Sequence, residues 1–274
     1  MAEHPWRNRF RRFRRCRKRR LRYVLSRRSC RNAALMLSWL VIVTVGSTAS
    51  AAALTSSSGL GISHTLHDTK PYAMNGAIFR GAFSSGDHFC SAGVVDSKGK
   101  NLIITAAHCV SGGTKDLYFV PGYHDGQAPY GVWPLGRTTA DNRWDSDRDE
   151  DLDVAFVAVQ PLNGRKIQDV VGGYTLGIDQ KMTRMVRITG YPGSTDTPVT
   201  CANRTTAYRT HQLRLDCTAY TGGTSGSPWV TRNGDVIGVI GGYQEGGSTP
   251  DISYSPYFDD DVRALYKEAV AASL

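Results

Sequence analysis

A serine in a glycine-rich turn is the most informative feature of the sequence. Ser225 lies in the stretch Gly-Gly-Thr-Ser-Gly-Ser-Pro at 222–228, and glycine permits a tight turn that exposes a serine hydroxyl. The backbone N–H groups of Gly223 and Ser225 can then point to one spot, where they would stabilise the oxyanion of a tetrahedral intermediate. Similar turns occur in inert loops, so this pattern needs partners elsewhere in the chain.

Two further side chains could activate that hydroxyl. His108 follows the apolar run 102–106 and stands next to Cys109, which suits a general base held at a fixed position. Asp153 directly precedes the apolar run 154–159, so its carboxylate can orient the imidazole from the mouth of a strand. Asp151 is the alternative carboxylate, and Asp153 is preferred because it abuts the run. The three residue types together predict nucleophilic catalysis by serine.

The elements that must position these residues are short β runs. They are separated by Gly, Pro, Asn and Asp, and Asn-Gly within 232–235 predicts a hairpin. Long helices do not alternate with the runs, so the pattern predicts barrels or sandwiches. The runs cover residues 92–95, 102–106, 117–120, 154–159, 185–189, 212–215, 227–231 and 236–240.

The end of the chain predicts one helix, over residues 259–274. Its apolar side chains recur at helical spacing and share one face, while Asp259 and Asp260 supply an N-cap and a favourable charge. We expect this helix to serve packing and not chemistry. The residues on the apolar face are Val262, Leu265, Tyr266, Ala269 and Val270.

Residues 1–53 have the three parts of a secretory signal. The formal net charge of the chain is +9, and residues 1–31 account for +13 of it, so the rest carries −4. The basic charge therefore belongs to the leader, which argues against a nucleic-acid partner. An apolar run at 33–45 and small residues near Ala51 or Ala53 follow. We expect export to the extracellular medium, by the Sec or twin-arginine route, with membrane contact only during export. A retained membrane anchor is the alternative.

Export changes the interpretation of the six cysteines. Cys16 and Cys30 lie in the leader, and four remain in a compartment where disulfides persist. Four cysteines allow three pairings, of which local pairing is the simplest: Cys90 with Cys109 and Cys201 with Cys217.

The three motifs resemble the signatures of the trypsin/chymotrypsin superfamily. They are Thr-Ala-Ala-His-Cys at 105–109, Asp-Val-Ala-Phe-Val at 153–157 and Gly-Thr-Ser-Gly-Ser-Pro at 223–228, in the order His, Asp, Ser. The resemblance implies an all-β fold of two antiparallel six-stranded barrels, over 72–165 and 166–258, with a linker or pro-segment at 54–71. It also implies a serine endopeptidase with His108, Asp153 and Ser225 as triad and Gly223 and Ser225 as oxyanion donors.

Two departures place the chain near the bacterial secreted branch, which includes glutamyl endopeptidases. Thr224 replaces the Asp that precedes the nucleophile in digestive enzymes, and no Ile-Val-Gly-Gly occurs near 70–80, so activation by that ion pair is not available. Ala219 stands at the position of the acidic residue that gives trypsin its preference for basic side chains. Ile240 stands at the position of the His with which glutamyl endopeptidases bind their substrates. An uncharged side chain before the scissile bond is therefore favoured, although Glu245 could restore a basic preference. The resemblance implies these substrate-binding residues: Ala219, Tyr220, Ile240, Gly241 and Gly242.

We expect protein or peptide substrates, a monomer, and no metal or cofactor. The acidic stretch 145–151 partly resembles a calcium loop but lacks its Gly and terminal Glu; a solvated loop is preferred, and structural calcium stays open. The alternative function is an inactive homologue that binds peptides in the same cleft.

Overall fold

The computed structural model describes residues 59–81, 83, 84 and 86–273 of the chain. The predicted signal peptide (1–53), with Cys16 and Cys30, and the start of the predicted linker lie outside the described residues. Among the residues that are described, no helix has the length and hydrophobicity needed to cross a membrane.

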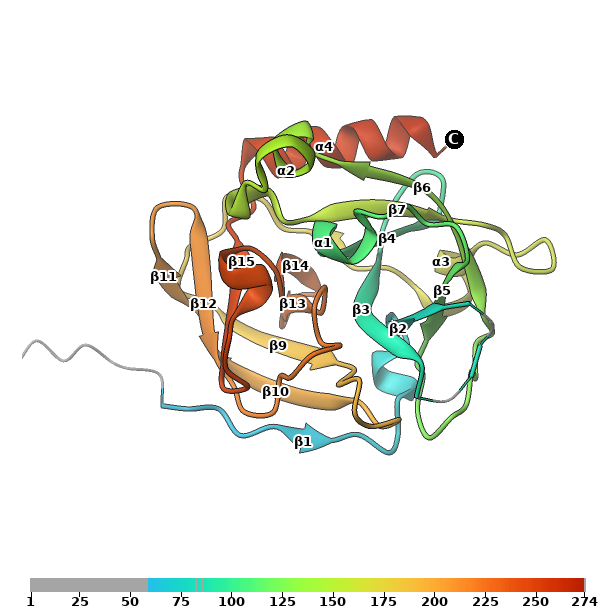
Figure 1. The fold of residues 1–274 in the computed structure, drawn as a ribbon, viewed down its shortest axis with the longest axis horizontal. Coiled ribbons are helices and arrows are strands. Elements are labelled where there is room, and N and C mark those ends of the chain that lie inside the picture. Colours follow the sequence, from blue (N-terminus) through green and yellow to red (C-terminus); the bar gives the residue numbers. More distant parts are fainter. Residues whose placement is uncertain (1–58, 82, 85, 274) are drawn as a thin grey trace, which may run out of the picture. The chain divides into compact units, whose positions relative to one another are not determined.

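The first half forms a closed antiparallel barrel in the order β2-β3-β4-β7-β6-β5. Closure pairs every strand on both sides and leaves no free edge. The first barrel is right of centre in Figure 1. Its strands are β2 (Asn75–Arg80), β3 (His88–Val95), β4 (Leu102–Thr105), β5 (Leu117–Pro121), β6 (Trp133–Ala140) and β7 (Ala155–Val159).

Strand β4 is apolar on both faces because each face is buried against a different core. Ile103 packs inside the barrel with Val94 and Val157. Leu102 and Ile104 point the other way, into a second core that includes Leu265 of the C-terminal helix. Successive side chains of a strand alternate between faces, so this double burial explains the continuous apolar run at 102–106.

The register of β4 and β7 brings two distant segments together. Thr105 pairs with Ala155 at the end of the antiparallel ladder. The chain after Thr105 and the chain before Ala155 therefore leave the barrel at the same end. His108 and Asp153 lie on these two segments, in the short helix α1 (Ala107–Val110) and directly after the 3-10 helix η2 (Glu150–Leu152).

The second half consists of two sheets. One has six strands in the order β1-β10-β9-β13-β14-β8, and the other has the order β11-β12-β15. The sheets contact each other through β14 with β15 and β10 with β12, as expected of a second barrel. Their strands are β1 (His64–Thr65), β8 (Thr175–Leu176), β9 (Met185–Gly190), β10 (Val199–Arg204), β11 (Thr206–Tyr208), β12 (Gln212–Asp216), β13 (Pro228–Thr231), β14 (Asp235–Val239) and β15 (Ile252–Pro256).

The segment predicted as a linker contributes to this half. Strand β1, within 54–71, pairs with β10, and Gly61 N donates to Asp216 O at 3.0 Å. The predicted hairpin at 232–235 is confirmed, since β13 and β14 pair antiparallel and Gly234 adopts a φ of 86°.

The predicted C-terminal helix is confirmed as α4 (Asp260–Ala272), with the Asp259 side chain accepting from Asp261 N as N-cap. It lies along β6 and β7 (Figure 1). Val262, Leu265 and Ala269 are buried on its inner face, as the helical spacing predicted. The remaining helical elements are η1 (Lys70–Tyr72), α2 (Asn142–Asp147), α3 (Ile167–Val171) and η3 (Tyr243–Gly246).

Candidate active site

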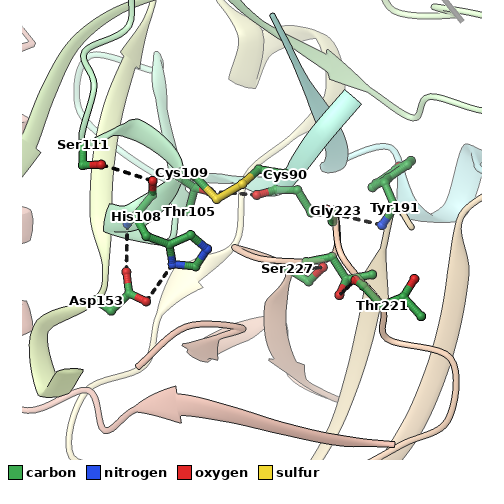
Figure 2. The surroundings of a disulfide bond; sticks show 12 residues. Cys90, Thr105, His108, Cys109, Ser111, Asp153, Tyr191, Thr221, Gly223 and Ser227 are labelled. Carbon is green, nitrogen blue, oxygen red and sulfur yellow. Dashed lines mark hydrogen bonds and ion pairs between the residues drawn. A yellow bond between two sulfur atoms is a disulfide. The ribbon is translucent and has the colours of Figure 1, made fainter. Parts of the chain in front are cut away.

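The carboxylate of Asp153 holds His108 by two hydrogen bonds. His108 Nδ1 lies 2.8 Å from Asp153 Oδ2, and His108 N donates to Asp153 Oδ1 at 2.9 Å. Figure 2 shows both contacts. Because the backbone and the ring of His108 bond to one carboxylate, its imidazole is fixed in orientation, with Nε2 left for another partner.

Asp153 is fully buried, and its charge is offset by N–H donors. Besides the two groups of His108, Gly242 N donates to Oδ2 at 2.9 Å. A buried carboxylate is stable only when its oxygens are bonded in this way. The close approach also explains Gly241, because a Cβ at that position would lie 2.6 Å from Asp153 O.

Asp151, the alternative carboxylate, has a different contact. Its Oδ1 accepts from Gln212 Nε2 at 2.6 Å, and the same Nε2 donates to Glu150 O at 2.9 Å. Gln212 Oε1 in turn accepts from Tyr243 N at 3.3 Å. Asp151 therefore helps to anchor the loop at η3, while Asp153 contacts the imidazole.

Opposing effects act on the pKa of His108. Burial lowers it, whereas the hydrogen bond and charge of Asp153 and the charge of Glu245 raise it, and the net result is a pKa above the ordinary value of 6.5. The protonated imidazolium is therefore stabilised in this site. The ring of Trp144, with its centroid 6.5 Å from that of His108, helps to exclude water from one side.

A disulfide anchors α1 beside His108. Cys109 is bonded to Cys90 of β3 (Figure 2), and Thr105 Oγ1 donates to Ser91 O at 2.8 Å. The second disulfide joins Cys201 and Cys217. Both predicted local pairings are thus confirmed.

The turn that carries Ser225 packs directly against the same segments. Ser225 O accepts from Ser91 N at 2.7 Å, and Gly226 N donates to Ile240 O at 2.7 Å. A Cβ at Gly226, where φ is +82°, would collide with Ser91 O and Thr105 Oγ1 and reach Ala106 N at 3.0 Å. This close packing places the serine turn against the start of α1, which contains His108.

The peptide between Gly222 and Gly223 is oriented by a hydrogen bond of its carbonyl, so that its N–H group points away from Gly193. Gly222 O accepts from Gly193 N at 2.8 Å, and in a trans peptide the N–H points opposite to the carbonyl. Among the described residues, neither Gly223 N nor Ser225 N donates to a protein acceptor. Position 223 requires glycine for two reasons: its φ is +98°, and a Cβ would lie 2.7 Å from Tyr191 O.

Ser91 is a site residue that the sequence did not single out. Its buried hydroxyl donates to Gly223 O at 3.0 Å and accepts from Tyr191 N at 3.0 Å. Ser91 thereby fixes the peptide that joins Gly223 to Thr224, directly after the Gly223 N–H group. Only its place beside Cys90 could have drawn attention to it.

Thr224 takes a local role where digestive enzymes have an aspartate. Its hydroxyl donates to Thr221 O at 2.7 Å, and Ser227 Oγ donates to Thr224 O at 2.7 Å. These bonds hold the turn without an ion pair to a new N-terminus.

A cavity of about 290 Å³ opens beside Ser225. Tyr220 and Ile240, two of the expected substrate-binding residues, line it. Gly242 lines a neighbouring hollow of about 370 Å³ that contains His108, and Gly241 packs on Asp153. Ala219 is exposed, with a φ of 70°, and does not line either space.

Among the described residues, one group of side chains lies close enough together to hold a metal ion: Cys90, His108 and Cys109. Both cysteine sulfurs are in a disulfide, so this group does not fit a metal ion. Within the acidic stretch, residues 142–147 form α2 and residues 150–152 form η2. Calcium binding there stays a prediction.

A family model described as a trypsin-like peptidase domain matches residues 90–239. No curated protein matches. Protease Anisep from Arthrobacter nicotinovorans is similar in structure, with a TM-score of 0.66 and 27% identity over 76% of this chain and 99% of that chain.

Two more distant structures share the fold. A thermostable serine protease, AL20, from an extremophilic microorganism has a TM-score of 0.64 and 24% identity, over 74% of this chain and 99% of its own. A Glu endopeptidase has a TM-score of 0.61 and 19% identity, over 76% and 96%. The matched segment 90–239 is more than half of the chain and contains His108, Asp153 and Ser225. The chain belongs to the trypsin-like peptidase family.

Proposed function

We propose that the protein is a serine endopeptidase that cleaves peptide bonds through an acyl-enzyme. The observation that carries the proposal is the buried Asp153 carboxylate, which fixes the His108 ring. The ring lies next to a serine turn whose Gly223 and Ser225 N–H groups have no protein acceptor among the described residues. A peptidase of this family needs each of these parts.

In the proposed reaction, His108 Nε2 takes the proton of Ser225 Oγ as the oxygen attacks the substrate carbonyl. Asp153 keeps the proton on Nδ1 and stabilises the imidazolium that forms. The N–H groups of Gly223 and Ser225 stabilise the oxyanion. The imidazolium then protonates the leaving amine, and water hydrolyses the acyl-enzyme by the same steps.

A fluorophosphonate probe tests this proposal, because it reacts with a serine that its base has activated. We expect one adduct, mapped to the peptide containing Ser225, and no adduct in Ser225→Ala. Ser146→Ala is the matched control, since Ser146 is an exposed serine of α2 that lines neither the cavity beside Ser225 nor the hollow with His108, and the variant should label fully. Correctly folded protein without an adduct would favour the inactive peptide-binding alternative.

We also propose that the protein acts outside the cell as a monomer. The two disulfides support this location, because such bonds persist in oxidising compartments. Intact mass of the mature protein should show cleavage near Ala51 or Ala53. Retention of residue 1 in a membrane fraction would support the anchored alternative instead. Light scattering at increasing concentration tests the monomer.

A further inference from the structure

Glu245 lies at the boundary between two hollows of the candidate active site. It lines the cavity beside Ser225 and also the hollow that contains His108. Its side chain is exposed, and among the described residues its carboxylate has no ion-pair or hydrogen-bond partner. A carboxylate in this position is available to a substrate.

Within the part of the chain that the structure describes, Glu245 is the one charged residue lining the cavity beside Ser225. The other polar groups there are neutral hydroxyls, including those of Ser248, Thr249 and Ser253. Hydroxyls can accept hydrogen bonds from an ammonium or guanidinium group. The cavity therefore offers one negative charge and several neutral acceptors.

The backbone around Glu245 is held in an unfavourable conformation. Gln244 and Glu245 have φ angles of 54° and 53°, in the left-handed region that is unfavourable for non-glycine residues. The loop is fixed to η2, because Gln244 N donates to Glu150 Oε1 at 2.9 Å. Within the loop, Glu245 N donates to Gly242 O at 2.8 Å. Strain of this kind collects where a side chain must be placed for function.

We propose that Glu245 selects substrates with Lys or Arg before the scissile bond, and that the same carboxylate couples the bound cation to His108. This inference rests on the proposed peptidase function and names its substrate class. It revises the expectation of an uncharged residue, because that expectation considered Ala219 and Ile240 and left the position of Glu245 open.

The coupling follows from the charges that face His108. Asp153 bonds to the ring, while Glu245, Glu150 and Arg148 line the same hollow. The charge of Glu245 contributes to raising the pKa of His108. A substrate cation beside Glu245 offsets that charge and so favours the neutral imidazole, which is the form that accepts the serine proton.

The first test compares two peptide amides that differ only in having Arg or citrulline before the scissile bond. Citrulline has nearly the same shape and no charge. We expect kcat/KM to favour Arg by about 10- to 100-fold, the range for a hydrogen-bonded charge. Glu245→Gln should bring the ratio close to one. Glu268→Gln is the matched control, since Glu268 is an exposed residue of α4, and should keep the wild-type ratio.

The second test uses pH. With the Arg substrate, the acid limb of kcat should lie at lower pH than that of kcat/KM, because the former reports the enzyme with bound cation and the latter the free enzyme. The two limbs should coincide for citrulline, and in Glu245→Gln for both substrates. A purely structural role of Glu245 would not move these limbs.

An unchanged Arg-to-citrulline ratio in Glu245→Gln would overturn the specificity. A collapsed ratio with unmoved limbs would overturn the coupling. Fluorophosphonate labelling of Glu245→Gln at Ser225 separates these failures from failure of the proposed function, which would show as absence of labelling in the wild type.

Discussion

Ser91 Oγ donates a hydrogen bond to Gly223 O at 3.0 Å across 132 residues of sequence. The bond links β3 of the first barrel to the turn in front of Ser225, and it fixes a peptide next to one of the two proposed oxyanion donors. The hydroxyl of Ser91 is fully buried, so removing it leaves the carbonyl of Gly223 without this partner.

Ser91→Ala should therefore lower kcat more than it changes KM. We expect a loss of about tenfold, smaller than the roughly 10²–10³-fold cost of deleting an oxyanion donor itself, because the Gly223 N–H remains but is less firmly oriented. Steady-state kinetics on one peptide amide measure this. Ser97→Ala is the control, since the Ser97 hydroxyl is buried and has no hydrogen-bond partner in the part of the chain that the structure describes. Equal effects of the two variants would contradict the positioning role.

Asp153→Asn should reduce kcat by about 10⁴-fold, because an amide no longer holds the required tautomer of His108. Asp151→Asn provides the comparison. Asp151 contacts Gln212 and not His108, so we expect less than tenfold loss. Thermal unfolding of both variants checks that each is folded. Comparable losses in kcat would mean that Asp153 has no special part in the reaction.

The acid limb of kcat/KM should have its midpoint above pH 6.5. Burial acts to lower the pKa of His108, but Asp153 and Glu245 raise it by a larger amount, and the neutral form is the one that acts as base. For a raised pKa, the stabilisation from His108 is complete below pH 6.5 and is lost as the pH rises through the folded-state value. Activity and this contribution to stability should thus change in opposite directions in a pH series.

His88 should make the protein sensitive to acid. It is almost fully buried, and its Nδ1 has no partner among the described residues; burial lowers its pKa below 6.5 despite the hydrogen bond to Pro192 O. A lowered pKa means stability that is present above pH 6.5 and declines as the pH falls toward the folded-state value.

Urea unfolding at pH 7.5 and pH 5 tests this expectation. His88→Gln should lose less free energy of unfolding between the two values than the wild type. His64→Gln, at an exposed position of β1, should follow the wild type. An equal decline in all three proteins would show that other groups cause the acid sensitivity.

The two disulfides should differ in their effect on activity. Each encloses a loop of similar length, with sequence separations of 19 and 16, and each should contribute about 3 kcal/mol to the free energy of unfolding. Removing Cys90–Cys109 by double Ser substitution should also slow fluorophosphonate labelling, because this bridge anchors α1 beside His108. Removing Cys201–Cys217 should lower Tm and leave the labelling rate near that of the wild type.

Much of the strand pattern followed from local sequence. Apolar runs bounded by turn residues predicted β4, β5, β7 and β9 to within about two residues. In β4 and β7, burial of both faces leaves a continuous apolar signal. Strand β6 (Trp133–Ala140) was missed. Its Pro134 and Gly136 are typical of loops, and its pairing with β7 depends on contacts that the local sequence does not encode, such as the close approach of Gly136 to Ala158 O.

The sequence by itself determined the candidate catalytic residues His108, Asp153 and Ser225. Each lies in a short motif beside a strand that can be recognised from its apolar run. Only the tertiary structure decided the rest. It decided that Asp153, and not Asp151, contacts the imidazole of His108. It also brought Ser91 to Gly223 and placed Glu245 between the cavity and His108. These relationships join segments 45 to 137 residues apart. They depend on barrel closure, strand register and a loop held in a strained conformation, none of which has a signal at the level of neighbouring residues.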